Sequence, residues 1–268
     1  MDLIRVENVL LDNIGFVELV DKMEEGAGLK VVNAARCSYG NKSEEYSEKD
    51  QKLVRYLHSA NPPHMSPFRH SYYTFLIKAP IMVFRQWTKY QVGCAWREYL
   101  VDGEAVDLEV VDLFYDTDKG CSWNELSGRY KKMENEFYIP HKMRANVAHG
   151  SKQASEEPED WDEGFHNQRR ADFEVAYEHA MDEYTHLLNM GVSKEQARLV
   201  LPSAVYSQAY WTVSLQGLMH FFEQRIHPDA QFEIRQYAWA IRKLLEPDLE
   251  EIYGPNQWSE PEENINEL

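Results

Sequence analysis

The spacing of hydrophobic positions predicts both helix and strand in the first third of the chain. Residues 46–59 repeat apolar side chains at helical intervals, as at Leu53 and Leu57, and are expected to form an amphipathic helix. Residues 61–67 contain three prolines and are expected to form a loop. Residues 70–78 alternate between the two faces of an extended chain, which predicts a strand with one buried face.

A second helix is expected to follow this strand. Pro80 suits the first turn of a helix, where the backbone N–H that proline lacks would have no partner in the helix. The sequence IMVFRQWTKYQ continues the helical pattern after it. Residues 94–121 are acidic and interrupt the pattern, so they are expected to be an insertion, and residues 141–172 are polar and expected to be a surface loop.

The last third of the chain is expected to be helical. Residues 172–190 have a periodic apolar face and are followed by Gly191, a residue type that often ends helices. Ser193 and Gln196 have the spacing of a capping box at the start of a short helix. Residues 205–226 contain many aromatic and aliphatic side chains and are expected to form one long helix.

One more helix is expected near the C-terminus. Asp229 fits its N-cap, the helix is expected to run through Leu245, and Pro247 is expected to end it. Residues 248–268 are expected to be a polar, frayed, acidic tail. Together these elements predict an α+β fold in one domain spanning residues 1–268, with a small antiparallel sheet and a larger helical part.

Composition limits the class of protein. The chain has 268 residues, of which 43% are hydrophobic and 13% aromatic, as is typical of a globular protein with a well-formed core. No run reaches the ~18 apolar residues of a membrane span, and the N-terminal residues lack the pattern of a secretory signal. Three cysteines do not make a disulfide framework, so a cytoplasmic location is expected.

The net charge of −17 is concentrated in three segments. Residues 94–121, 155–164 and 248–268 contain most of the excess of acidic side chains, while the rest of the chain is close to neutral. Global acidity disfavours nonspecific binding of nucleic acid, whose phosphates would be repelled. The net charge does not exclude a local pocket that binds an anionic small molecule.

Candidate chemistry lies in two short segments and two arginines. FRQWTKY (84–90) is expected on a helix, and NELSGRY (124–130) is turn-like, with a Ser-Gly pair whose backbone N–H groups could approach an anion. Arg198 and Arg225 lie in apolar, helical surroundings and offer planar donor groups for phosphate or carbonyl oxygens. These residues alone leave open that the arginines form surface ion pairs and that the Ser-Gly pair is only a tight turn. No GxGxxG or P-loop pattern occurs.

Several long motifs in series resemble one family. MSPFRHSYYTFLIKAPIMVFRQW, NELSGRYKKMENEFYIP, EQARLVLPSAVYSQAYWTVSLQGLMHFFEQR and AQFEIRQYAWAI closely resemble segments of the flavin-dependent thymidylate synthases, and AARCSYG resembles that family's early block. The resemblance runs from about residue 30 to residue 245, except for 94–121 and 141–172. It implies the family's α+β protomer and a homotetramer with active sites shared between chains.

The resemblance implies an enzyme that converts dUMP to dTMP, a methyltransferase reaction. Methylenetetrahydrofolate would supply the carbon, FAD would carry it and supply the hydride, and NADPH would reduce the FAD. Arg225 is implied as the catalytic residue, because a guanidinium near the uracil ring stabilises the negative charge that develops there. The implied partners are therefore dUMP and folate, with neither nucleic acid nor a membrane surface among them.

The resemblance also implies the binding residues, by their positions in the motifs. The implied dUMP contacts are Gln86, Trp87, Thr88, Lys89, Glu125, Leu126, Ser127, Gly128, Arg129, Arg198 and Arg225. The implied FAD contacts are Ser66, Lys89, Tyr90, Gln91, Glu125, Ser214, Leu215, Gln216 and His220. Ser127 is assigned to binding rather than to nucleophilic catalysis, and His220 fits a flavin contact and a core histidine equally well. The spacing of histidines and cysteines predicts no metal site.

Two departures from the family pattern leave an alternative open. The family's Arg-His-Arg segment is replaced by Lys89, Tyr90 and Gln91, which retain one charge and lose both guanidinium groups. The alternative is a nucleotide- or flavin-binding family member that has lost turnover. A helical interaction module without a ligand is a third hypothesis, which the motifs support least.

The second departure is the insertion, residues 94–121. Its two ends are near copies, GCAWRE (93–98) and GCSWNE (120–125), which indicates that the chain leaves and re-enters the motif at equivalent points. The Cα atoms of Cys94 and Cys121 are therefore expected to lie close together, near the ~4.4–6.8 Å that a disulfide requires.

Overall fold

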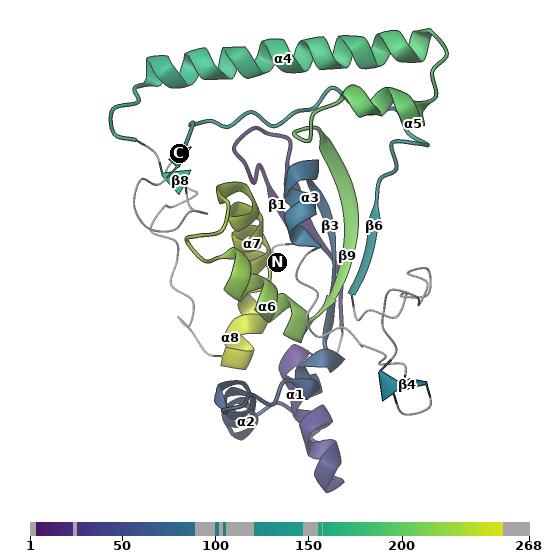
Figure 1. The fold of residues 1–268 in the computed structure, drawn as a ribbon. Helices are drawn as coiled ribbons and strands as arrows, with labels where there is room; N and C mark the ends of the chain where they lie inside the picture. The colour runs from purple at the N-terminus through teal and green to yellow at the C-terminus, as the bar shows by residue number, and fades with distance from the viewer. Residues whose placement is uncertain are drawn as a thin grey trace.

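The computed structural model describes residues 4–23, 26–88, 100–101, 104–105, 121–146, 155–156 and 158–253. A five-stranded antiparallel sheet forms the centre, with strands in the order β1-β2-β3-β9-β6 (Figure 1). Its strands are β1 (Arg5–Glu7), β2 (Phe16–Lys22), β3 (Tyr72–Pro80), β6 (Cys121–Glu125) and β9 (Tyr206–Ser214). The predicted α+β class, with a small antiparallel sheet and a larger helical part, is confirmed.

Helices surround this sheet. They are α1 (Ala27–Arg36), α2 (Glu48–Ser59), α3 (Ile81–Trp87), α4 (Glu163–Asn189), α5 (Lys194–Ala197), α6 (Leu215–Arg225), α7 (Phe232–Leu244) and α8 (Glu246–Tyr253). Short 3-10 turns are η1 (Cys37–Tyr39), η2 (Ser66–His70) and η4 (Arg198–Val200), and two-residue strands are β4 (Leu100–Val101), β5 (Glu104–Ala105), β7 (Ala145–Asn146) and β8 (Ser155–Glu156). In Figure 1, α4 lies across the end of the sheet where β9 begins, and α1 and α2 lie at the other end.

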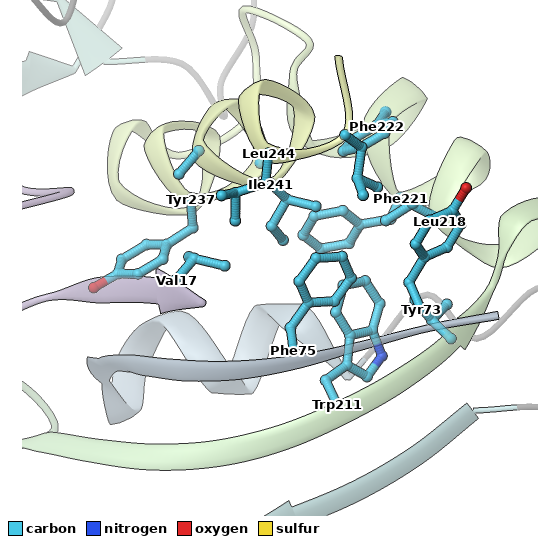
Figure 2. Packing of buried hydrophobic residues seen from close by; sticks show 14 of the residues in the cluster. Val17, Tyr73, Phe75, Trp211, Leu218, Phe221, Phe222, Tyr237, Ile241 and Leu244 are labelled. Carbon is cyan, nitrogen blue, oxygen red and sulfur yellow. The ribbon is translucent and has the colours of Figure 1, made fainter. Parts of the chain in front are cut away.

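The core lies between the sheet and helices α6 and α7. In β3, every second side chain is buried, and Phe75 pairs in register with Trp211 of β9. Figure 2 shows these two rings facing Phe221 of α6 and Ile241 of α7. Burial of such aromatic and aliphatic side chains is the main favourable contribution to folding.

The first helix and the first strand predicted before residue 90 agree with the structure, whereas the helix expected over 81–91 ends at Trp87, with Thr88 as its C-cap. The helix predicted over 46–59 is α2, whose N-cap Ser47 forms a capping box with Asp50. The strand predicted over 70–78 is β3. Pro80 is displaced by one position from its expected place, because it ends β3 and serves as the N-cap of α3.

The prediction of one long helix over 205–226 is wrong. The first part is strand β9, which pairs with β3 on one side and with β6 on the other, and the second part is α6. Aromatic and β-branched residues favour a strand when two neighbours are present to pair with it. Ser214 begins the helix, since its hydroxyl accepts a hydrogen bond from the N–H of Gly217 at 3.2 Å.

The prediction of a surface loop over 141–172 is wrong for its last ten residues, because α4 begins at Glu163. Asp162 caps that helix by accepting a hydrogen bond from the N–H of Phe165 at 2.8 Å. The acidic residues before and within the first turn of α4 were interpreted as part of a surface loop. Acidic residues are also favourable at the N-terminus of a helix, so this composition did not distinguish the two. Of the α4 side chains, His166 and Tyr184 are buried.

Three further details of the C-terminal third are corrected. Ser193 precedes α5, but its side chain makes no capping hydrogen bond within the described residues. Gln231, not Asp229, is the N-cap of α7. Pro247 lies in the first turn of α8, a position that tolerates proline, so the expected tail is helical over 248–253, where Leu249 and Ile252 are buried.

Two expectations concern parts of the chain that are not described. Cys94 lies outside the described residues, so its predicted proximity to Cys121 stays a prediction. Most of the insertion 94–121 and the last part of the tail, residues 254–268, also lie outside them. Among the described helices, none combines the length and the apolar character needed to cross a membrane.

Candidate functional site

Arg225 and Gln86 meet where two helices end. Arg225 is the last residue of α6 and is only 8% exposed, and its Nη2 donates to the main-chain carbonyl of Gln86, in the last turn of α3, at 2.8 Å. The side chain of Gln86 is half-buried and its Nε2 donates to Oε1 of Gln231, the N-cap of α7. A guanidinium held in this way is preorganised and partly desolvated, which strengthens its interaction with negative charge.

Two more residues extend this network into the core. Glu233 is 8% exposed and accepts hydrogen bonds from Nε2 of Gln231 at 2.7 Å and from the hydroxyl of Tyr138 at 3.1 Å. Burial in the first place, and then the negative charge of Glu233, raise the pKa of the Tyr138 phenol far above its ordinary value. Tyr138 is therefore a donor throughout the physiological range of pH.

The turn after β6 lies against Arg198. Ser127 begins the turn, with its carbonyl accepting from the N–H of Tyr130 at 3.0 Å and its hydroxyl accepting from the N–H of Arg129 at 3.3 Å. Gly128 is buried, and a Cβ atom built there would lie 3.1 Å from Cδ of Arg198. The structure thus brings two exposed guanidinium groups, those of Arg129 and Arg198, to one turn.

This turn has the composition of an anion site. Lys194 of α5 binds it from the side by donating to the carbonyl of Tyr130 at 2.9 Å. Two arginines, a serine hydroxyl and a glycine that permits close approach are typical partners of a phosphate group. Glu125, the last residue of β6, is exposed just before the turn, and Leu126 donates its N–H to the carbonyl of Gln208 at 2.8 Å.

Four of the nine residues implied as flavin contacts lie at the start of α6 or along it: Ser214, Leu215, Gln216 and His220. Ser214 and Leu215 are buried, and the side chain of Gln216 accepts a hydrogen bond from Nε of Arg69 at 2.6 Å. Ser66 opens η2, the short turn that contains Arg69, and its side chain is exposed. His220 lies one turn further along α6, with Nδ1 at 3.7 Å from Glu223. Arg69 was not singled out in the sequence, although it stands inside the motif MSPFRHSYY.

These two groups lie toward opposite ends of the sheet. Glu125 pairs with Ala209 of β9, whereas Ser214 ends the same strand five residues later. At about 3.3 Å per residue, the two positions are separated by roughly 17 Å along the strand. Within the described residues, one chain therefore does not bring the turn at Ser127 to the start of α6.

The side chain of Trp87 is part of the hydrophobic core. Its side chain is 1% exposed and packs against an aromatic cluster made by Phe84, Trp123, Trp211, Phe221 and Tyr237. Thr88, the C-cap of α3, donates its hydroxyl to the carbonyl of Phe84 at 3.4 Å. Any contact of Trp87 with a ligand would have to come from its backbone.

The remaining expected residues lie outside the described part. They are Lys89, Tyr90 and Gln91, the residues in the place of the family's Arg-His-Arg segment. Among the described residues, no three His, Cys, Asp or Glu side chains converge as metal ligands. Sequence reasoning missed Tyr138, Gln231 and Glu233, although Tyr138 belongs to the motif NELSGRYKKMENEFYIP and the other two belong to AQFEIRQYAWAI.

Comparison with known proteins identifies relatives over most of the chain. The profile of the family described as "Thymidylate synthase complementing protein" matches residues 18–100 and 116–249. The flavin-dependent thymidylate synthase of Thermosipho africanus is 37% identical over 240 residues, which cover 90% of this chain and 89% of that protein. An enzyme of the same name from Thermus thermophilus is 36% identical over 253 residues, covering 94% and 77% respectively.

A solved structure has a similar fold. It is a UMP/dUMP methylase, PolB, from Streptomyces cacaoi, bound with 5-Br dUMP. The similarity has a TM-score of 0.69 and 30% identity, and covers 89% of this chain and 93% of that one. The interval 101–115, between the two matched stretches, falls within the expected insertion, whose full extent stays a prediction.

Proposed function

The chain belongs to the flavin-dependent thymidylate synthase family, and from this membership we propose that it catalyses the reductive methylation of dUMP to dTMP. The observation that carries the proposal is the place of Arg225, which is buried and anchored on the carbonyl of Gln86. Methyl transfer to the uracil ring requires stabilisation of negative charge on the ring oxygens. A fixed guanidinium in a partly desolvated site provides that stabilisation without reorganisation.

The nucleotide would bind through two parts of this chain. Arg129, Arg198 and Ser127 would bind the phosphate, since charge-assisted hydrogen bonds from arginine suit phosphate oxygens. Gln86 and Arg225 would face the base. The acidic chain thus retains a local positive region at the turn after β6, which suits an anionic nucleotide and not a long nucleic acid.

The residues at the start of α6 fit a flavin. Gln216, Arg69 and His220 offer hydrogen-bond donors and acceptors of the kinds that the edge of a flavin ring or its phosphates would use. When bound, FAD would carry the carbon from methylenetetrahydrofolate and supply the hydride, after reduction by NADPH. The chain's own part is to orient the flavin beside α6. Because their side chains are buried, Ser214 and Leu215 would contribute through the backbone.

A homotetramer with shared active sites is part of the proposal. It is supported by the separation of the turn at Ser127 from the start of α6, since a neighbouring copy would be needed to join the two groups. Apolar side chains are exposed beside the turn: Leu199 is 81% exposed and Tyr130 is 75% exposed. Exposed apolar groups of this kind are typical of surfaces that associate. The cytoplasm is the proposed location, with neither nucleic acid nor a membrane surface as a partner.

One experiment tests the proposal and its alternative together. The purified protein is titrated with dUMP and its flavin absorbance is recorded, and the same preparation is assayed for dTMP formed from dUMP, methylenetetrahydrofolate and NADPH. Flavin binding, dUMP binding and turnover support the enzyme. Binding of flavin and of dUMP without turnover supports the alternative, a binding protein that has lost catalysis through replacement of the Arg-His-Arg segment. Failure to bind either ligand contradicts both.

A further inference from the structure

We propose that Glu233 is a positioning residue that fixes the amide orientation of Gln86 through Gln231, and so makes the site prefer a uracil ring to a cytosine ring. The inference rests on the proposed function, because it assumes that the base of a pyrimidine nucleotide lies against Gln86. It concerns a residue that lies behind the site, in the wall formed by the start of α7.

The hydrogen bonds that lead from Glu233 through Gln231 to Gln86 form a relay. This relay begins at a group that can only accept hydrogen bonds. Both oxygens of the Glu233 carboxylate are in use, one facing the hydroxyl of Tyr138 at 3.1 Å and the other facing the amide nitrogen of Gln231 at 2.7 Å. A carboxylate has no proton to donate. The amide of Gln231 must therefore present its nitrogen to Glu233, because the opposite orientation would bring two acceptors together in a buried place.

The orientation is passed on to Gln86. With its nitrogen directed at Glu233, Gln231 directs its Oε1 at Gln86, and Nε2 of Gln86 donates to that oxygen. The reverse orientation of Gln86 would again oppose two oxygens. The carbonyl oxygen of the Gln86 amide is therefore directed away from Gln231, although this side chain is half-buried and could otherwise rotate. Tyr138 donates to the other oxygen of Glu233 at 3.1 Å and lies outside the path of hydrogen bonds from Glu233 to Gln86.

The fixed orientation selects between two pyrimidines. Uracil carries an N3–H donor between two carbonyl oxygens, whereas cytosine carries an acceptor at N3 and an amino group at C4. The oxygen of Gln86 matches the donor of uracil and opposes the acceptor of cytosine. Arg225, anchored on the backbone of Gln86, has only donors to offer and suits the carbonyl oxygens of uracil. A site with fixed polar groups discriminates strongly against a ligand that leaves them unpaired.

The test compares two variants that each remove one hydrogen bond from the same carboxylate. In Glu233→Gln, the new amide can donate or accept, so Gln231 and then Gln86 can adopt either orientation. In Tyr138→Phe, the matched control, the bond to the other oxygen is lost while Glu233 still accepts from Gln231. Binding of dUMP and dCMP to the flavin-loaded enzyme is measured by calorimetry. Circular dichroism and thermal unfolding show that each variant is folded.

We expect the ratio of dUMP to dCMP affinity to fall by about tenfold or more in Glu233→Gln, as loss of one oriented hydrogen bond allows. Tyr138→Phe keeps the wild-type ratio. If Glu233→Gln does not fold, Gln231→Met replaces it in the test. This substitution keeps the side-chain volume and removes the relay, so the ratio of dUMP to dCMP affinity is expected to fall by a similar factor.

The outcomes separate this inference from the proposed function. A wild-type protein that does not bind dUMP overturns the proposed function and removes the basis of the inference. A wild-type protein that prefers dUMP, together with a Glu233→Gln or Gln231→Met variant of unchanged preference, overturns the inference alone. An equal loss of preference in Tyr138→Phe also overturns it, because general loosening of the site would then explain the effect.

Discussion

Arg225 and Gln86 stand 139 positions apart in the sequence, and a hydrogen bond of 2.8 Å from the guanidinium of Arg225 to the carbonyl of Gln86 joins them. The bond links the last turn of α6 to the last turn of α3. Neither helix alone would fix the arginine, whose long side chain has many rotamers. Together they hold one guanidinium at the place where the uracil ring is proposed to bind.

Arg225→Ala is expected to lower the rate of dTMP formation by about 10²–10³, since that is the usual cost of removing one donor from a charge-stabilising site. Flavin content and the far-ultraviolet circular dichroism should stay close to those of the wild type. Arg169→Ala is the matched control, because Arg169 is an exposed arginine on α4 paired with Asp172 at 3.2 Å. Near wild-type turnover in Arg225→Ala would show that the charge is stabilised elsewhere.

Arg129→Ala is expected to weaken dUMP binding more than FAD binding. Arg129 is exposed on the turn after β6, far along the sheet from the start of α6, and a guanidinium there would grip the phosphate. Titration calorimetry with dUMP, and fluorescence titration with FAD, measure the two affinities. Lys131→Ala removes a nearby positive charge that pairs with Glu134 and should change neither. An unchanged dUMP affinity in Arg129→Ala would exclude Arg129 from the nucleotide site.

Local patterns were sufficient to predict β3, and insufficient to predict β9. In β3, alternation is clear, and Pro80 marks its end. In 206–214, aromatic spacing fits a helix as well as a strand, and the pairing with β3 and β6 decides between them. Those pairings join segments far apart in the chain, so no local pattern contains them.

The same limit applies to the candidate site. Motif resemblance assigned Arg225 and Arg129 to it, because those residues lie inside long matching segments, and this assignment stays a prediction. It could not give the bond from Arg225 to the backbone of Gln86, which depends on how α3 and α6 pack. It also gave Trp87 the role of a ligand contact, whereas its side chain fills the aromatic core.

Leu199→Glu is expected to shift the protein from a tetramer to smaller species. Leu199 is 81% exposed and is the neighbour of Arg198, so a shared site would bury it against another copy. Burying an unpaired charge in such an apolar contact costs more free energy than the contact contributes to association. Light scattering should give about four times 31.5 kDa for the wild type and less for the variant. Ile4→Glu, at an exposed apolar residue before β1, is the control, and equal masses for all three proteins would contradict the prediction.

Asp50→Asn is expected to lower the thermal stability at neutral pH, with a smaller effect in acid. Burial alone would raise the pKa of Asp50, but hydrogen bonds from Ser47 and the charge of Arg36 at 2.5 Å hold it below its ordinary value of 3.8. The charged form thus stabilises the fold above about pH 4, and this contribution is lost as the pH falls through the lowered pKa.

Melting temperatures measured from about pH 3 to pH 7 test this expectation for Asp50. The difference between wild type and Asp50→Asn should correspond to about 1–3 kcal/mol near neutral pH and should shrink in acid. Glu163→Gln is the control, since Glu163 pairs with Arg170 on the exposed surface and should affect the melting temperature little. A difference that stays constant with pH would show that the charge of Asp50 contributes nothing.

Gly128→Ala is expected to weaken dUMP binding on the order of tenfold, since small misplacements of binding groups are costly. The new methyl group would lie 3.1 Å from Cδ of Arg198 and 3.1 Å from Sδ of Met133, so both side chains must give way by a few tenths of an ångström, which displaces Arg198 beside the turn. Calorimetry with dUMP measures the loss. Gly164→Ala is the matched control, because its methyl group would lie 3.2 Å from the Asp162 carboxylate, equally crowded but on α4. If both variants bind dUMP as the wild type does, Arg198 does not need the close approach that glycine permits, and its assignment to the phosphate is wrong.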